Sequence, residues 1–166
     1  MVIMGAASIT LPQRLSEKLR EKAEETGYLP EELGVEFVLK GLNEELDPED
    51  LVERYQSLSK RHLADAKEIL KRGDLVRASE KFGEASALAV KRIAAMQGLK
   101  SDKHGAIWSF MSRLSRESRD KELILLFHAA NGLHKNIYEN ELDQKAVEIT
   151  AESVENFIEE LGRISQ

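Results

Sequence analysis

The sequence of 166 residues has no cysteine, three prolines and only 5% aromatic residues. Without cysteine it can form no disulfide, no thiolate metal site and no thiol nucleophile, and such a composition suits the reducing cytoplasm. Because aromatic rings are few, aliphatic side chains and alanine have to fill the core. Hydrophobic residues make up 42% of the chain and charged residues 33%, which is the balance of a folded globular protein rather than a disordered one.

The chain also lacks an excess of basic charge and any long apolar run. Its formal net charge is -6 at pH 7, whereas contacts with phosphates need clustered Lys and Arg, so the composition disfavours a nucleic-acid partner. No uncharged run approaches the roughly 20 residues of a membrane span. Residues 1–7 lack the basic start and the apolar run of a signal peptide. The sequence therefore predicts a cytoplasmic protein without a membrane partner.

Residues 1–46 predict a small N-terminal dimerisation segment. Residues 8–11 alternate polar and apolar side chains, which is typical of a short strand, and apolar residues at helical spacing predict helices over 12–27 and 30–42. Strand, helix, turn and helix in this order resemble a ribbon-helix-helix unit, which is stable only as an intertwined dimer. Such units usually bind DNA, but five basic residues stand here against nine glutamates. This balance favours dimerisation over DNA binding.

Residues 47–166 predict an up-down antiparallel helical bundle. Apolar stripes at the period of an α-helix mark four long helical stretches. These stretches are 48–72, 74–97, 103–117 and 121–139. A fifth helix follows, with Thr150 as its expected N-cap. Gly73, Gly98 and Ser118 mark connections so short that neighbouring helices run antiparallel.

The stretch 74–97 carries a seam of mostly small side chains. Asp74 has the position and the chemistry of an N-cap. The seam that follows consists of Leu75, Ala78, Ser79, Phe82, Ala85, Ser86, Ala89, Ile93 and Met96. Because small side chains leave room for a neighbouring backbone, we expect a second helix to pack very close to this one.

Two histidines fall inside apolar stripes, where polar groups need a partner. His62 lies in the stripe of 48–72, with Asp65 one turn later, and His134 lies near the centre of the stripe of 121–139. His104 precedes a third apolar face. We assign no catalytic residue. A candidate pocket would consist of His62, His104, Asn131, His134 and Tyr138.

Three interpretations of these histidines are open. In the first, each buried imidazole is neutral and hydrogen-bonded and fixes the register of its helix. In the second, His62, His104, His134 and a carboxylate bind a metal, although no H-x-x-x-H or E-x-x-H pair puts two ligands on one helical face. In the third, His134 is a general acid–base in a ligand- or RNA-processing pocket. The first interpretation is favoured, and it predicts neither a metal nor a cofactor.

A row of arginines follows the third helical stretch. Arg113, Arg116 and Arg119 recur at helical spacing. Such a row is typical of a solvated helix face. It also suits contact with a phosphate or with an acidic partner, so both interpretations stay open.

The residues 71–82 (KRGDLVRASEKF), together with His104 and the residues 133–139 (LHKNIYE), resemble the PaREP family of archaeal paralogous proteins. The resemblance covers about residues 48–162 and implies a bundle similar to the HEPN superfamily. It implies no particular activity. The ribonucleases of that superfamily use an Arg and a His at a shorter spacing than the eight residues between Arg119 and His128.

The sequence therefore predicts an all-α fold: a HEPN-like up-down bundle behind a ribbon-helix-helix-like segment. We expect a homodimer that forms through this segment and through the helix of 121–139, in which Ile124 and Leu125 point away from the apolar stripe. The favoured function is a non-enzymatic interaction module with a protein partner, such as a nucleotidyltransferase-like protein. The alternative is a degenerate HEPN-type ribonuclease or nucleotide-binding protein with a pocket around His134.

Overall fold

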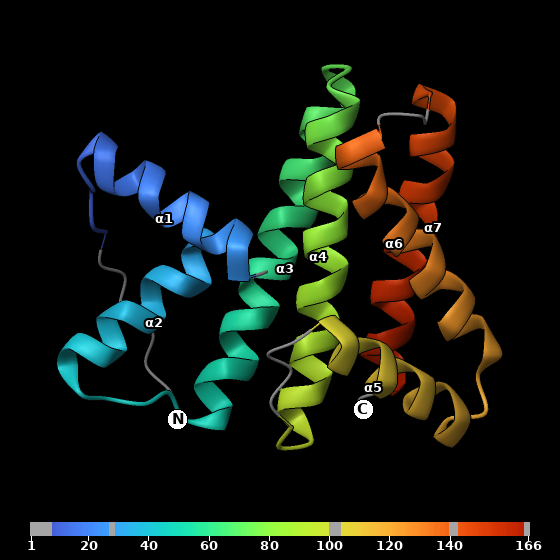
Figure 1. Cartoon of the computed structure of the whole chain (residues 1–166). Helices are drawn as coiled ribbons and strands as arrows, with labels where there is room; N and C mark the ends of the chain where they lie inside the picture. The colour runs from blue at the N-terminus through green and yellow to red at the C-terminus, as the bar shows by residue number, and fades with distance from the viewer. Residues whose placement is uncertain (1–7, 27–28, 100–103, 140–142, 165–166) are drawn as a thin grey trace. The chain divides into compact units, whose positions relative to one another are not determined.

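The computed structural model describes residues 8–26, 29–99, 104–139 and 143–164, and of these it gives the backbone alone at 104–106 and 134–139. These residues form seven α-helices and no strand, so the predicted all-α fold class is confirmed. The chain divides into two compact units, Met1–Asp50 and Leu51–Gln166, both drawn in Figure 1.

The N-terminal unit consists of two helices, α1 (Gln13–Thr26) and α2 (Pro30–Leu42). Proline suits the first turn of α2 because its missing N–H would have no partner there. Asn43 ends α2 in a left-handed backbone conformation with φ 55°, which Asn adopts more easily than most residues. The two helices pack on each other, since a Cβ added to Gly34 of α2 would lie 3.7 Å from Leu19 Cδ2 of α1.

The strand predicted at 8–11 is wrong for the single chain. Residues 8–12 have no regular secondary structure, and α1 starts directly after them. A strand needs a neighbouring strand for its backbone N–H and C=O groups, and the described residues of one copy contain none. A single chain therefore forms the two helices of the expected strand–helix–helix order, and residues 8–11 form no strand in it.

The second unit is a helical bundle. Its helices are α3 (Pro48–Lys71), α4 (Leu75–Met96), α5 (His104–Glu117), α6 (Lys121–Glu139) and α7 (Gln144–Ile164). Figure 1 shows α3, α4, α6 and α7 running alternately up and down, as predicted, with α5 in the connection from α4 to α6. None of the described helices combines the length and the apolarity that crossing a membrane requires.

Short connections set this alternation. Asp74 caps α4 as predicted, because its Oδ1 accepts a hydrogen bond from the Arg77 backbone N–H at 3.2 Å. Gly73 and Gly98 adopt φ values of 82° and 72°, a region that glycine enters without steric cost. Ser118 lies in the turn after α5, as predicted, and the left-handed residue of this turn is its neighbour Arg119, with φ 55°.

The start of α7 differs from the prediction. Thr150 is not the N-cap; it lies inside the helix, and its Oγ1 donates to the Ala146 carbonyl at 2.7 Å. Asp143 Oδ1 accepts a hydrogen bond from the Ala146 N–H at 2.8 Å and caps the helix. A sequence does not distinguish a threonine at a helix cap from one that bonds back to a carbonyl inside the helix. The prediction therefore placed the start of α7 too late.

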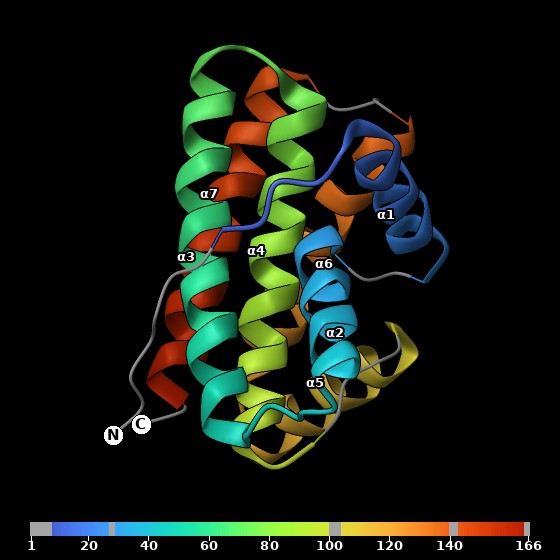
Figure 2. The ribbon, with the colours of Figure 1, turned by 90° about the vertical axis from the view of Figure 1, so that its left-hand side faces the viewer.

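Helix α4 is the centre of the bundle. Figures 1 and 2 both show it between α3 and α6. Twelve of its 22 residues are buried, and eight of these twelve are Ala, Ser or Gly, so the side that α4 turns to the interior consists mostly of small residues. Met96 departs from the expected seam, because 45% of its surface is exposed. Around α4 the core forms two apolar clusters, both shared with α6 and α7.

Candidate functional site

Polar side chains join α3 to α4 in the interior. His62 of α3 is 2% exposed, and its Nδ1 lies 3.1 Å from Oε2 of Glu84 on α4. The same carboxylate oxygen lies 3.1 Å from Nζ of Lys81, one turn earlier on α4. Asp65, the acidic residue that follows His62 in sequence, is exposed instead. The carboxylate of Glu84 therefore bridges two cationic or potentially cationic groups.

A hydrogen bond between the same two helices lies beside this contact. Ser59 precedes His62 by one helical turn, and its Oγ donates to the Ala85 carbonyl at 2.8 Å, with both groups buried. We call Ser59, His62, Lys81 and Glu84 the α3–α4 polar layer. Because buried polar groups stabilise a fold only when they are paired, the layer fixes the register of α3 against α4.

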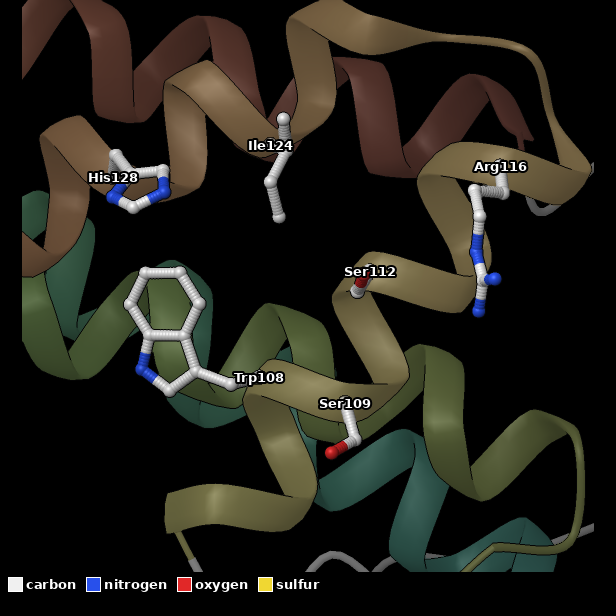
Figure 3. A pocket seen from close by; sticks show the side chains of 6 residues that line it. All are labelled: Trp108, Ser109, Ser112, Arg116, Ile124 and His128. Carbon is white, nitrogen blue, oxygen red and sulfur yellow. The ribbon is translucent and has the colours of Figure 1, made fainter.

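A second group of polar side chains lies on the surface between α5 and α6. These residues line an open groove with a volume of about 600 Å3. We call it the α5–α6 groove; its residues are Trp108, Ser109, Ser112, Arg116, Ile124 and His128. Figure 3 shows Trp108 and His128 toward one end, Arg116 toward the other, and Ser112 between them.

The aromatic end of the groove is fixed by ring contacts. The Trp108 ring meets Phe127 edge to face, with centroids 4.4 Å apart. It also lies against the His128 ring, at 4.8 Å between centroids and 57° between planes. Phe127 in turn contacts Phe157 of α7 at 5.8 Å in the core. Trp108 is therefore anchored on its inner side while its outer part remains partly exposed.

The three arginines of the predicted basic row are in different situations. Arg113 Nε lies 3.7 Å from Glu117 Oε1, and its guanidinium lies over the Phe110 ring at 5.5 Å. Arg119 stands in the connection after α5. Arg116 is exposed and lines the groove at one end, and none of the described carboxylates pairs with it. Of the three arginines, Arg116 is the one that lines the α5–α6 groove.

The structure places the five predicted pocket residues in different settings. His62 is buried in the α3–α4 polar layer, and Asn131 is half-buried on α6. The other three, His104, His134 and Tyr138, belong to α5 and α6, but their side chains lie outside the described ones. A pocket around His134 therefore stays a prediction.

The metal hypothesis depends on the same undescribed side chains. Among the side chains that the structure describes, no three of His, Asp or Glu are placed to hold a metal ion. Two of the three proposed histidine ligands, His104 and His134, are not among them. That hypothesis also stays untested.

Sequence reasoning missed Glu84 and the groove. Glu84 directly adjoins the small-residue seam of α4. An acidic residue beside a buried seam can pair with an inward-facing histidine of another helix, and this was the signal that the sequence offered. On α5, Trp108, Ser112 and Arg116 recur every four residues and so share one face. That spacing could have revealed one wall of the groove, but the contribution of α6 required the fold.

The sequence matches one protein family over most of the bundle. The profile of the Archaeal PaREP1/PaREP8 family matches residues 54–158, which run from the first turns of α3 to the later turns of α7. The family resemblance seen in the sequence is therefore confirmed. No curated protein matches the chain.

A solved structure shares the fold. The crystal structure of a protein from Sulfolobus solfataricus is similar to this chain with a TM-score of 0.59 and 24% sequence identity. The similarity covers 66% of this chain and 97% of that one. At this identity it shows the fold alone.

Proposed function

The chain belongs to the archaeal PaREP1/PaREP8 family, and from this premise we propose that it is a non-enzymatic interaction module that assembles as a homodimer. The proposal includes a HEPN-like architecture for the bundle, which the alternating order of α3, α4, α6 and α7 supports. It also includes a cytoplasmic location, which a chain without cysteine suits.

The observation that carries the proposal is the exposure of large apolar side chains in the N-terminal unit. Six of them are between 40% and 70% exposed: Ile9, Leu11, Leu15, Phe37, Val38 and Leu42. Among the described residues of this unit the buried apolar side chains are Ala23 and Leu33. Exposed large apolar side chains in such number favour an interaction surface in this unit.

A second copy of the chain is the occupant that suits this surface. In a two-fold dimer the same patch on each copy covers its counterpart. Such a dimer also gives residues 8–11 the strand partner that a single copy lacks. On α6, Leu125 is 66% exposed, as predicted, and we assign it to the same dimer. Ile124 is instead half-buried against the core because it faces α5.

The protein partner is the second part of the proposal. The HEPN resemblance favours a nucleotidyltransferase-like protein, which would bind the dimer rather than compete with it. Affinity capture from an archaeal host of the family, with the wild-type chain as bait, tests this part. Recovery of the chain alone, under conditions that preserve the dimer, would refute it.

Sedimentation equilibrium tests the dimer at micromolar concentration. We expect twice the chain mass of 18.7 kDa for the wild type and a monomer for Phe37→Glu/Leu42→Glu, because burying carboxylates in an apolar interface is costly. Ile149→Glu, at a 57% exposed position of α7, is the matched control and should stay dimeric. A monomeric wild type, or a dimeric double variant, would contradict the proposal.

The alternative function, a degenerate ribonuclease or nucleotide-binding protein built around His134, rests on side chains outside the described ones. An RNA-cleavage screen of the wild type and of His134→Ala tests it. Cleavage that the wild type performs and the variant does not would replace the non-enzymatic proposal. Equal absence of cleavage in both would count against the ribonuclease, and a nucleotide-binding screen of the same two proteins then tests the other form of the alternative.

A further inference from the structure

We propose that the α5–α6 groove is the docking site of the protein partner, and that the partner inserts an amphipathic helix whose acidic end meets Arg116. This inference rests on the protein partner of the proposed function and names its surface and its chemistry. It uses residues other than the apolar side chains assigned to the homodimer. Three features carry it: an open furrow between two helices, an apolar end that is anchored from below, and a positive charge that no described carboxylate balances.

The groove has the form of a furrow between two helices. One wall is a face of α5, where Trp108, Ser112 and Arg116 recur every four residues. The other wall contains Ile124 and His128, one turn apart on α6. A helix packs into such a furrow by seating a ridge of its side chains there, and amphipathic helices dock on partner proteins in this way. Because a small molecule needs a site that encloses most of its surface, the open groove suits a helix better.

The apolar end of the groove is anchored from below. Trp108 and Ile124 are half-buried and pack against the same core cluster, and the Trp108 ring contacts Phe127 at 4.4 Å between centroids. Side chains that are already held lose little conformational entropy when a partner covers them. Because hydrophobic burial has no preferred direction, an aliphatic side chain gains free energy from covering whatever part of the indole and of Ile124 is exposed. This end therefore suits the apolar side chains of a partner helix.

The other end of the groove carries an unbalanced positive charge. Residues 107–119 contain three arginines and one glutamate, and this Glu117 has its Oε1 3.7 Å from Arg113 Nε. The next acidic residue, Asp120, accepts a hydrogen bond of 3.0 Å from the backbone of α6. Arg116 is exposed, none of the described carboxylates pairs with it, and none of the lining residues is acidic. The complementary group of a protein partner is a carboxylate, which a guanidinium binds through two parallel hydrogen bonds.

The positions of the two ends define the partner helix. Trp108 and Arg116 lie two helical turns apart, or about 12 Å along the axis of α5. On a helix that lies along the groove, the same distance separates two residues of one face that are about eight positions apart. We therefore expect apolar side chains at one end of this face and Asp or Glu at the other. A nucleic acid would need a track of several cations, whereas Arg116 is the one permanent cation among the lining residues.

A peptide selection tests the inference before the partner is identified. The probe is a phage-displayed library of random peptides of about 16 residues, or about four helical turns, selected on the wild-type chain. We expect the enriched peptides to carry an acidic residue about eight positions from an apolar one. An enriched peptide with a fluorescent label should bind with micromolar affinity in an anisotropy titration. Its charge-reversed form, with Lys in place of each Asp or Glu, should bind at least about tenfold more weakly.

Variants of α5 locate the bound peptide. Arg116→Gln should weaken binding of the labelled peptide about tenfold, because it removes the charge from the groove. Ser112→Glu should have a similar effect without disturbing the fold, since its carboxylate pairs with Arg116 one turn later on the same helix. Arg113→Gln removes an equal charge from a guanidinium that already lies beside Glu117. This matched control should bind the peptide as the wild type does.

The apolar end of the groove has its own measurement. Trp108 is the one tryptophan of the sequence, so the intrinsic fluorescence of the chain reports on the groove. A selected peptide without tryptophan should shift this emission to shorter wavelength, because it removes water from the indole. The shift should saturate at the same peptide concentration as the anisotropy. A peptide that binds without changing the emission would lie elsewhere on the protein and would overturn the proposal.

Further outcomes would also overturn the proposal. These are a selection that enriches no peptide, peptides that bind Arg116→Gln as well as the wild type, and equal weakening in Arg116→Gln and Arg113→Gln. Single-stranded RNA that displaces the peptide from the wild type and binds more tightly would make the occupant a nucleic acid and contradict the proposal. The sedimentation test of the homodimer does not depend on any of these results. If affinity capture recovers a partner equally well with wild-type and Arg116→Gln baits, the interaction module stands and the groove alone is refuted.

Discussion

The α3–α4 polar layer and the α5–α6 groove hold the same kinds of side chain in opposite settings. The layer has Ser59, His62 and Lys81, and the groove has Ser112, His128 and Arg116. In the layer the hydroxyl and the imidazole are buried. Each of them lies against a polar group of the neighbouring helix α4. In the groove the hydroxyl, the imidazole and the guanidinium are exposed. Burial and partners, not residue type, therefore separate a structural histidine from one available to a ligand.

The largest expected effect comes from the two histidines. His62→Ala should lower the free energy of unfolding by about 2–4 kcal/mol, since it leaves a cavity and a partly buried carboxylate without its neighbour. His128→Ala, on the surface, should cost less than about 1 kcal/mol. Urea denaturation of both variants measures the difference. Equal losses would erase the distinction between layer and groove.

The charge of the layer gives the next effect. Glu84→Gln keeps the shape of the side chain but removes the charge that lies 3.1 Å from both His62 and Lys81. We expect a loss of about 1–3 kcal/mol. Glu117→Gln, which breaks the exposed pair with Arg113, is the control and should cost at most about 1 kcal/mol. A Glu84→Gln variant that melts with the wild type would show that the bridge is dispensable.

The hydroxyls give a smaller effect of the same sign. Ser59→Ala removes the buried hydrogen bond to the Ala85 carbonyl and should destabilise the protein by about 1 kcal/mol. Ser112→Ala, at an exposed position of α5, should be neutral or slightly stabilising because alanine is the better helix former. Thermal melting of the two variants side by side decides the matter, and the reverse order would contradict it.

The smallest effect on stability belongs to Arg116. We expect Arg116→Gln to change the free energy of unfolding by less than about 0.5 kcal/mol, as is usual for an exposed side chain away from special features. A large loss of stability in denaturant melts would make Arg116 a structural residue and remove the contrast with the layer.

The sequence predicted the helices better than it predicted their partners. The helical period of the apolar residues, together with the capping and turn residues, predicted α3 to α6. Asp74, Gly73 and Gly98 could be interpreted from the sequence because each acts within a few residues of its own position. The start of α7 was wrong because Thr150 has two local hydrogen-bonding options, which only Asp143 upstream resolves. The strand predicted at 8–11 does not form in the single chain, because alternation records a preference, whereas a strand also needs a neighbouring strand.

The candidate site was less predictable for a related reason. The apolar stripe of 48–72 correctly predicted that His62 faces inward. Its neighbour Glu84 lies on another helix, however, and Asp65, which is nearer in the sequence, is exposed. The groove combines one face of α5 with two residues of α6, and no pattern within either helix fixes how they meet. Contacts between elements depend on packing angles and register, which a single sequence does not state.

The tight turn at Gly73 also bears on the order in which the chain folds during synthesis. The bond from Ser59 to Ala85 joins residues 26 positions apart, and such near-sequence contacts form fast. The α3–α4 hairpin can therefore close soon after both helices leave the ribosome. Helix α7 supplies part of both apolar clusters and is made last of the seven. Until then α4 and α6 present a bare apolar face, so we expect nascent chains that stop before Gln144 to depend on chaperones.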